Sequence, residues 1–249
     1  MSRHHLNHLS WIQFRERVPK KTDLVMVPVG TVEAHGALPL GTDTLIPERL
    51  AEILAPRFDA LIAPSIPYGV TNTLLPYPGS TTVSSATFRA YLFEACAGLV
   101  DTGFRRVVIL NGHGGQSGEV ADVVARLWNE KKAFAAAIEW WGMASESSRK
   151  VYGEKTSGHA GVEESAMVIA IDPTLVDAKA LVKARRLPRR YGVRTRPFPA
   201  TIILDKPEKN GDGAPDPDPK KAVKFEALVV KEIGVVLKEI FEGWGELGR

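Results

Sequence analysis

Apolar positions follow two different periods along the first two-thirds of the chain. Short apolar runs of the kind that form buried parallel strands occupy residues 23–30, 60–66, 105–112 and 132–141. Between these runs, apolar residues recur every three or four positions, a spacing that predicts helices over 43–54, 84–100 and about 120–127. The pattern therefore alternates strand and helix.

This alternation predicts an α/β fold, a three-layer α/β/α arrangement with a mostly parallel central sheet. Crossovers of helical length join strands that run parallel in one sheet, with helices on both faces. We expect a single domain over residues 1–249, ending in an amphipathic helix near 225–240. Ligands bind such sheets beyond the carboxyl ends of the strands.

Composition narrows the function classes. The 249 residues carry a formal net charge of +3, which is too balanced for a bulk nucleic-acid binder. No run of about 18 apolar residues is present, so we expect no membrane span. The N-terminal stretch lacks the apolar core of a signal peptide, and its histidines (His4, His5 and His8) predict a mobile, solvated segment. Cys96 is the single cysteine, which fits a cytoplasmic protein.

Three potential metal ligands fall within EAHGALPLGTD (33–43), a stretch rich in Gly and Pro. Glu33 and His35 are two apart, so in an extended segment their side chains point to the same side. Asp43 can return to that side after the turn. A mixed set of a carboxylate, an imidazole and a second carboxylate indicates a metal site.

Two further glycine-rich stretches follow the third and fourth strands. NGHGGQSG (111–118) either cradles an anion at a helix N-terminus or projects His113 as a ligand. SGHAGVEES (157–165) places His159 in a turn ahead of Glu163 and Glu164. Those two acids either compensate the helix dipole or contribute a ligand.

Taken together, the three stretches favour a metal centre. Every histidine outside the N-terminal segment lies in one of these glycine-flanked turns. A mixture of imidazole and carboxylate suits Zn²⁺, Mn²⁺ or Fe²⁺ better than Ca²⁺ or an all-thiolate structural Zn²⁺ site. The set is large enough for two divalent ions that share a bridging carboxylate.

These motifs resemble those of the creatininase (creatinine amidohydrolase) family. The resemblance runs from about Val27 to about Pro173 through VPVGTVEAHGALPLGTD, NGHGG and GHAGVEES, in that order, and includes PYPGSTTVS at 76–84. It implies a creatininase-like fold and a binuclear metal-dependent amidohydrolase. By position, it implies that the metal ligands are Glu33, His35, Asp43, His113 and Glu164, with Asp43 bridging.

The resemblance also implies roles near the substrate. It places His159 as the catalytic residue, acting on the reacting amide, and Trp140 and Trp141 as an aromatic pair at the pocket; core packing or a subunit interface is the alternative for the tryptophans. We expect Asn111 to lie at the substrate side and orient a ligand by a hydrogen bond. Gly115 stands where creatininases carry a metal-binding Glu, so the ligand is assigned to Glu164, with Glu163 as its rival.

The expected function is metal-dependent hydrolysis of a small-molecule cyclic amide or other non-peptide C–N bond. The alternatives are a formamide deformylase acting on a phosphorylated pyrimidine precursor of flavin or deazaflavin, and a non-catalytic metal-binding regulatory protein. The basic run at 183–196 is either a solvated loop or subunit rim, or a phosphate contact. The resemblance further implies a homo-oligomer, a hexamer.

Overall fold

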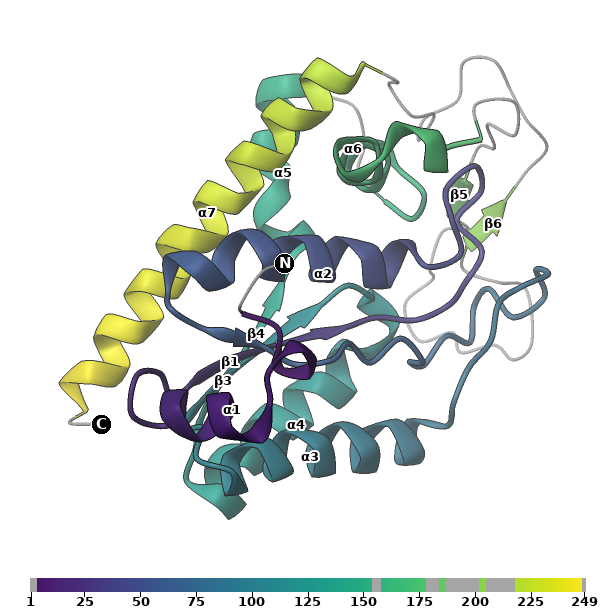
Figure 1. Ribbon diagram of the computed structural model, residues 1–249. Helices are drawn as coiled ribbons and strands as arrows, with labels where there is room; N and C mark the ends of the chain where they lie inside the picture. The colour runs from purple at the N-terminus through teal and green to yellow at the C-terminus, as the bar shows by residue number, and fades with distance from the viewer. Residues whose placement is uncertain (1–3, 154–157, 178–183, 187–201, 205–217, 248–249) are drawn as a thin grey trace.

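A central parallel sheet organises the molecule. The computed structural model describes residues 4–153, 158–177, 184–186, 202–204 and 218–247. The sheet has the order β2-β1-β3-β4, and every pair in it is parallel (Figure 1). Its strands are β1 (Leu24–Val29), β2 (Leu61–Ile62), β3 (Arg106–Asn111) and β4 (Phe134–Glu139). The predicted α/β class with a parallel sheet is confirmed.

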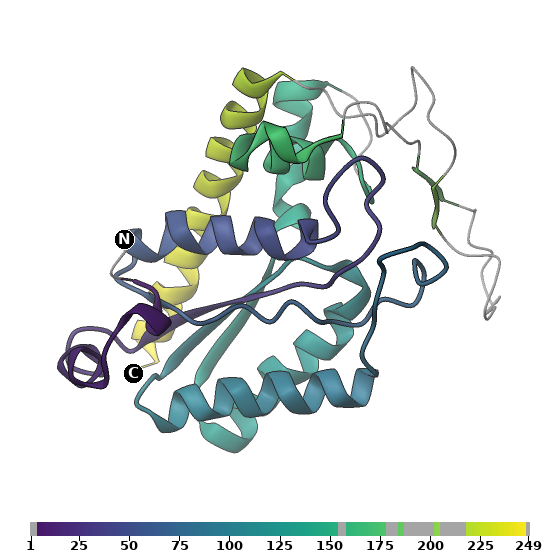
Figure 2. The same cartoon turned by 45° about the vertical axis from the view of Figure 1, so that its right-hand side comes forward.

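Helices cover both faces of this sheet, which gives three layers (Figures 1 and 2). One face carries α2 (Thr42–Leu54), α5 (Trp140–Tyr152), α6 (Val162–Ile171) and α7 (Pro219–Glu246). The other carries α3 (Ser85–Asp101) and α4 (Ser117–Lys131). The remaining helical elements are α1 (Trp11–Arg17) and the 3-10 turns Leu6–His8, Ala55–Arg57, Gly114–Gln116 and Pro173–Leu175.

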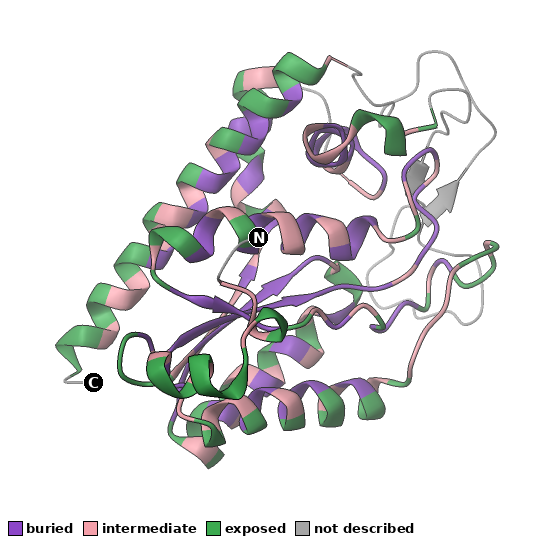
Figure 3. Cartoon of the chain, in the orientation of Figure 1, coloured by how far each residue is buried: buried purple, intermediate pink, exposed green. Residues whose placement is uncertain are grey.

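Alternation along the strands divides the hydrophobic core into two parts. On β1, Leu24 and Met26 join the cluster under α2, α5, α6 and α7, whereas Val25 and Val27 join the cluster under α3 and α4. All six residues of β1 are buried, as Figure 3 shows, whereas β4 at the edge of the sheet is only partly buried over most of its length. A strand covered on both faces must be apolar throughout, which explains the continuous runs in the sequence.

Several expected boundaries differ from those observed. The predicted strand 132–141 is wrong at its end, because β4 stops at Glu139 and both tryptophans begin α5. The expectation of a mobile N-terminal segment is wrong for its described part. Ile62 N donates to the carbonyl of His4 at 2.8 Å, and His5 forms a parallel bridge with Ile62, so this segment lies along the edge of β2.

A small antiparallel sheet pairs β5 (Ala184–Arg186) with β6 (Ile202–Leu204). Apart from β5, the basic run at 183–196 lies outside the described residues, as does most of the expected loop at 206–221. In the described part of the chain, no helix combines the length and apolar character required to cross a bilayer.

The packing of α7 generates a stability prediction. Phe225 is fully buried, and its ring meets Tyr152 of α5 edge-on at 5.9 Å. We expect Phe225→Ala to lower the free energy of unfolding by about 3–5 kcal/mol, because the packing is lost and a cavity remains. Urea denaturation followed by circular dichroism measures this. Val235→Ala, on the same helix but 47% exposed, is the control and should change stability by less than about 1 kcal/mol. Equal effects of the two substitutions would contradict the assigned packing of α7.

Candidate metal centre

Six ionisable side chains from separate parts of the chain meet at the carboxyl edge of the sheet. They follow β1, begin α2, follow β3, and precede or begin α6. Their ligand atoms form three overlapping groups, each with atoms within 4.8 Å of one another. The groups are Glu33, His35 and His159; Glu33, Asp43 and His113; and His35, Asp43 and Glu164. All five predicted metal ligands and the predicted catalytic histidine are therefore brought together.

Asp43 reaches this edge because two glycines leave room for its backbone. Gly30 and Gly112 directly follow β1 and β3. A Cβ added at Gly30 would lie 2.6 Å from the carbonyl carbon of Asp43, and one added at Gly112 would lie 2.8 Å from the same atom. These distances are too short for any side chain, so the first turn of α2 packs directly against two strand ends.

The Asp43 carboxylate divides its two oxygens between two histidines. Oδ1 lies 3.0 Å from His35 Nε2, and Oδ2 lies 2.9 Å from His113 Nδ1. The Asp43 side chain is 2% exposed. Asp43 accordingly belongs to two of the three groups.

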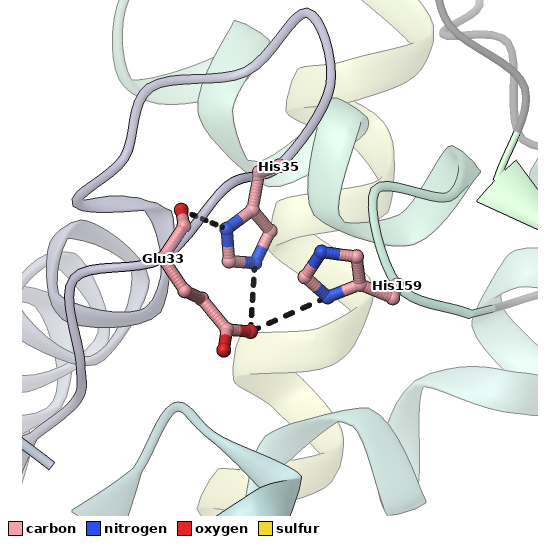
Figure 4. Close-up of side chains that lie close together, drawn as sticks. All are labelled: Glu33, His35 and His159. Atoms are coloured by element: carbon pink, nitrogen blue, oxygen red, sulfur yellow. Dashed lines mark hydrogen bonds and ion pairs between the residues drawn. The ribbon is translucent and has the colours of Figure 1, made fainter. Parts of the chain in front are cut away.

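Glu33 provides a second convergence point. Its Oε1 lies 3.3 Å from His113 Nδ1 and 3.4 Å from His159 Nδ1, with His35 Nε2 at 3.9 Å. Figure 4 shows the His35 and His159 rings turned toward this oxygen. One carboxylate oxygen thus faces three imidazole nitrogens.

Each imidazole is also held from behind by a backbone carbonyl. The pairs are His35 Nδ1 with Glu33 O at 3.0 Å, His113 Nε2 with Val70 O at 3.2 Å, and His159 Nε2 with Ala34 O at 2.6 Å. A carbonyl only accepts, so the outer nitrogen of each ring carries the proton. The inner nitrogen is then the one available to a cation, as in metal-ligating histidines.

Several of the side-chain atoms that face the centre of the cluster lack a hydrogen-bond partner, and a bound cation could take that place. Glu33 Oε1 and Oε2, His35 Nε2 and Asp43 Oδ2 are buried without an aligned hydrogen-bond partner. Each buried polar group left unsatisfied costs about 1–3 kcal/mol, and more when it is charged. Oxygen and imidazole donors in this mixture match Zn²⁺, Mn²⁺ or Fe²⁺. The donor set therefore suits divalent cations, which would satisfy these atoms.

The protonation states of the metal-free site follow from the close charges. Burial opposes a charge on His35, but the carboxylate of Asp43 prevails and raises the pKa of His35 to about 10. The pKa of His113 is likewise raised to about 10, since Asp43 and Glu33 outweigh the effect of burial. Burial would raise the pKa of Asp43, yet these two imidazoles hold it well below its usual range.

His159 and Glu164 have pKa values that shift in the opposite direction to those of the other two histidines of the cluster and of Asp43. Burial and the charge of His35 lower the pKa of His159 to about 4, so that this imidazole is neutral at neutral pH. Burial raises the pKa of Glu164 to about 7 against the attraction of His35. Opposite shifts in adjacent groups are typical of functional sites.

The structure brings Glu164, and not its neighbour, into the described cluster. Glu164 Oε2 lies 3.9 Å from His35 Nε2 and accepts from the backbone N–H of Ala160. Glu163 is buried but belongs to none of the three groups. The geometry therefore favours Glu164 as the ligand carried by α6.

Asn111 supports the loop that carries His113. Its Nδ2 donates to the carbonyl of His113 at 3.0 Å, and its Oδ1 accepts from the N–H of His113 at 3.2 Å. These bonds are compatible with the expected role of Asn111 in orienting a ligand, which stays a prediction. Contact of its side chain with a substrate stays a prediction.

The two tryptophans lie in different environments. Trp140 is 1% exposed and packs in the hydrophobic core, which is the alternative given for it above. Trp141 is half-buried, and a Cβ added at Gly114 would lie 3.7 Å from its Cζ2. Trp141 is therefore the one beside the His113 turn, and contact of either indole with a substrate stays a prediction.

Two supporting residues were not expected from the sequence. The carbonyl of Val70, in the loop after β2, binds the His113 ring, and the buried amide of Gln116 contacts Asn111. A backbone carbonyl has no sequence signature. A glutamine in the first turn before a helix was a weak signal that only its complete burial makes informative.

Comparison with known proteins agrees with these motifs. The sequence model of the Creatininase family, described as creatinine amidohydrolase, matches residues 7–225. Creatinine amidohydrolase of Pseudomonas putida is 26% identical over 195 residues, which cover 71% of this chain and 75% of that protein. 3-Dehydro-scyllo-inosose hydrolase of Thermotoga maritima is 41% identical over 108 residues, 41% of this chain and 33% of that protein. Mycofactocin precursor peptide peptidase of Mycolicibacterium smegmatis is 30% identical over 172 residues, 66% of this chain and 64% of that protein.

Solved structures agree in fold. A crystal structure of creatinine amidohydrolase (creatininase) superposes with a TM-score of 0.79 at 22% identity, covering 95% of this chain and 97% of that one. A creatininase described as the Mn form gives 0.81 at 23% identity and covers 95% and 98%, respectively. A creatininase variant described as Zn-Zn type gives 0.80 at 22% identity and covers 96% and 98%. At this identity the likeness establishes the fold.

The charged histidines generate a prediction about cation binding. His35 and His113, each with a pKa of about 10, must lose their inner protons before they can bind a cation. Protons therefore compete with the cation below that pKa, and apparent affinity should rise with pH by up to about 100-fold per unit when two protons are displaced. Titration calorimetry at pH 7 in two buffers of different protonation enthalpy measures the release. Identical heats in both buffers would contradict the charged state of the metal-free site.

Proposed function

This chain belongs to the creatininase family, and on that premise we propose that it is a metal-dependent hydrolase of a small-molecule amide. The bond cleaved would be that of a cyclic amide or another non-peptide C–N bond. The observation that carries the proposal is the shared Asp43 carboxylate, which faces His35 with one oxygen and His113 with the other. Three carboxylates and three imidazoles within one buried cluster support it.

We assign two cation positions to this cluster. Glu33, Asp43 and His113 would hold one cation, and His35, Asp43 and Glu164 would hold the second, with Asp43 common to both. Divalent cations in such pairs act as Lewis acids that polarise a carbonyl and make a water molecule nucleophilic at neutral pH. Zn²⁺ or Mn²⁺ is favoured, in keeping with the creatininase forms described above, and Fe²⁺ is compatible with the same donors.

His159 is the group that moves a proton. Its Nε2 donates to the carbonyl of Ala34 at 2.6 Å, which fixes the ring and leaves the Nδ1 lone pair facing Glu33. A neutral Nδ1 can accept a proton from the attacking water and deliver it to the leaving nitrogen. Its low pKa keeps it unprotonated before the reaction. Trp141, which lies beside Gly114, would stack on a flat substrate.

The relatives indicate the general class of the substrate but not its identity. They are a creatinine amidohydrolase, an inosose hydrolase and a precursor-peptide peptidase, so we favour an amide hydrolase over the deformylase and over a non-catalytic metal-binding protein. The basic run at 183–196, which we associated with a phosphorylated substrate, lies outside the described residues apart from β5 and does not enter this choice. We further propose a cytoplasmic homo-oligomer, a hexamer, on the basis of the family resemblance.

Metal removal tests the proposal. Dialysis against a chelator should abolish hydrolysis in a panel of creatinine, other cyclic amides, a formamidopyrimidine and a short peptide, and Mn²⁺ or Zn²⁺ should restore it. Elemental analysis should find about two ions per chain, as expected for a site with a shared carboxylate. Hydrolysis that persists without metal, or a metal-loaded protein inactive on every class of amide, would contradict it.

Substitution of one ligand is the sharper test. His113→Ala should lower the metal content by about one ion per chain and activity by at least about 100-fold, because it removes a ligand of the paired site. His8→Ala, which changes an exposed histidine that belongs to none of the three groups, is the matched control and should leave both unchanged. Full metal retention in His113→Ala would remove that residue from the ligand set.

A further inference from the structure

Gln116 joins three segments at the carboxyl edge of the sheet. It ends the 3-10 turn Gly114–Gln116 and is completely buried. Its Oε1 accepts from the N–H of Val70 at 3.2 Å, and its Nε2 donates to Asn111 Oδ1 at 3.0 Å and to the carbonyl of Gly30 at 3.5 Å. One amide thus links the ends of β1 and β3 to the loop that follows β2.

The first of these bonds acts on the His113 ring. Val70 donates its N–H to Gln116 and accepts the Nε2–H of His113 on its carbonyl, at 3.2 Å in each case. The position of this loop therefore sets which nitrogen of His113 is protonated and where the ring lies. Gln116 holds Val70, and with it this loop, in place by a hydrogen bond. Gln116 therefore positions the His113 ring indirectly, through Val70.

The second bond acts on the His113 backbone. The amide of Gln116 presents a donor to Asn111, so the oxygen of Asn111 must face it. That same oxygen accepts the N–H of His113, and the Asn111 Nδ2 donates to the His113 carbonyl. With the opposite amide orientation, Asn111 would lose both bonds to His113. Gln116 therefore fixes the backbone of His113 as well as its ring.

Close packing restricts both the Gln116 amide and the His113 ring to their observed positions. A Cβ added at Gly69 would lie 2.9 Å from Gln116 Cδ, and one added at Gly115 would lie 3.1 Å from His113 Cδ2. The amide and the ring are each covered by a glycine backbone, and a larger residue at either place would displace them.

We propose that Gln116 is the positioning residue for His113, holding its Nδ1 toward Glu33 and Asp43 through Val70 and Asn111. The proposal rests on the metal-binding function proposed above. The Gln116 amide bonds to Val70, Asn111 and Gly30, none of which is one of the six clustered side chains, so we give it a positioning role and not that of a ligand. It determines how well one of the two cation positions is formed.

Gln116→Met tests this role, because Met has a similar length and no amide. Cation affinity is measured on the full-length protein by competition of Zn²⁺ with a chromophoric chelator. We expect the affinity of one of the two ions to fall about 10–100-fold, the usual effect of losing a partner of a metal ligand. The d–d absorption of the Co²⁺-loaded protein should change as well, which a loss of stability alone would not cause.

Thr22→Val is the matched control. It removes another buried side-chain hydrogen bond, from Leu24 N to Thr22 Oγ1 at 3.2 Å, at the opposite end of β1. It should lower the melting temperature without changing cation affinity or the Co²⁺ spectrum. Wild-type affinity for both ions in a folded Gln116→Met protein would overturn the proposal.

Gln116→Glu covers the case in which the methionine variant does not fold. Glutamate keeps the acceptor for Val70 but lacks the donor to Asn111, so we expect a loss of at least about tenfold for one ion. Unchanged affinity in this variant would overturn the proposal. A wild-type protein that binds no divalent ion refutes the proposed function, whereas normal wild-type binding with no effect of Gln116 refutes this inference alone.

Discussion

Asp43 carries a buried negative charge between His35 and His113, where the ends of β1 and β3 meet the start of α2. Removing a carboxylate from water costs several kcal/mol, and only well-placed opposite charges offset it. The surrounding structure meets that requirement in detail. Gly30 and Gly112 admit the Asp43 backbone, and carbonyl groups fix the imidazoles so that they point inward. The site is therefore built into the sheet edge rather than added to its surface.

The layers of the fold could be predicted from the sequence because a strand that is buried on both faces of a sheet is apolar at nearly every position. Continuous apolar runs marked β1 and β3, and three- or four-residue spacing marked α2 and α3, with Ser84 accepting from Thr87 N as the N-cap. Boundaries were less predictable where an apolar strand continues into an apolar helix. At Glu139 the change of backbone conformation occurs between residues that suit both structures, so α5 was not foreseen.

The candidate site was predictable to the extent that it depends on residue type. Glu33, His35 and His113 were identifiable as candidates because carboxylate and imidazole side chains recur in glycine-containing turns that follow the predicted strands. The residues that position these side chains by hydrogen bonds could not be predicted from the sequence. The Val70 carbonyl acts through the backbone, and Gln116 acquires its role only when three segments distant in sequence come together. Gly115 illustrates the same point: its missing side chain leaves space for the His113 ring, and Glu164 of α6 brings a carboxylate oxygen within 3.9 Å of His35 Nε2.

The placement of Glu164 has a mechanical consequence. It lies on α6, which packs on α7 and α2, whereas Glu33 and His113 lie on loops that leave the sheet. A cation held by His35, Asp43 and Glu164 would tie residue 35, on the loop that follows β1, to residue 164 and close a long loop of the chain, much as a disulfide does in a secreted domain. Ion occupancy would then govern how firmly the layer of α2, α6 and α7 is held to the strands, so that chemistry and structural integrity would be lost together when the ions leave.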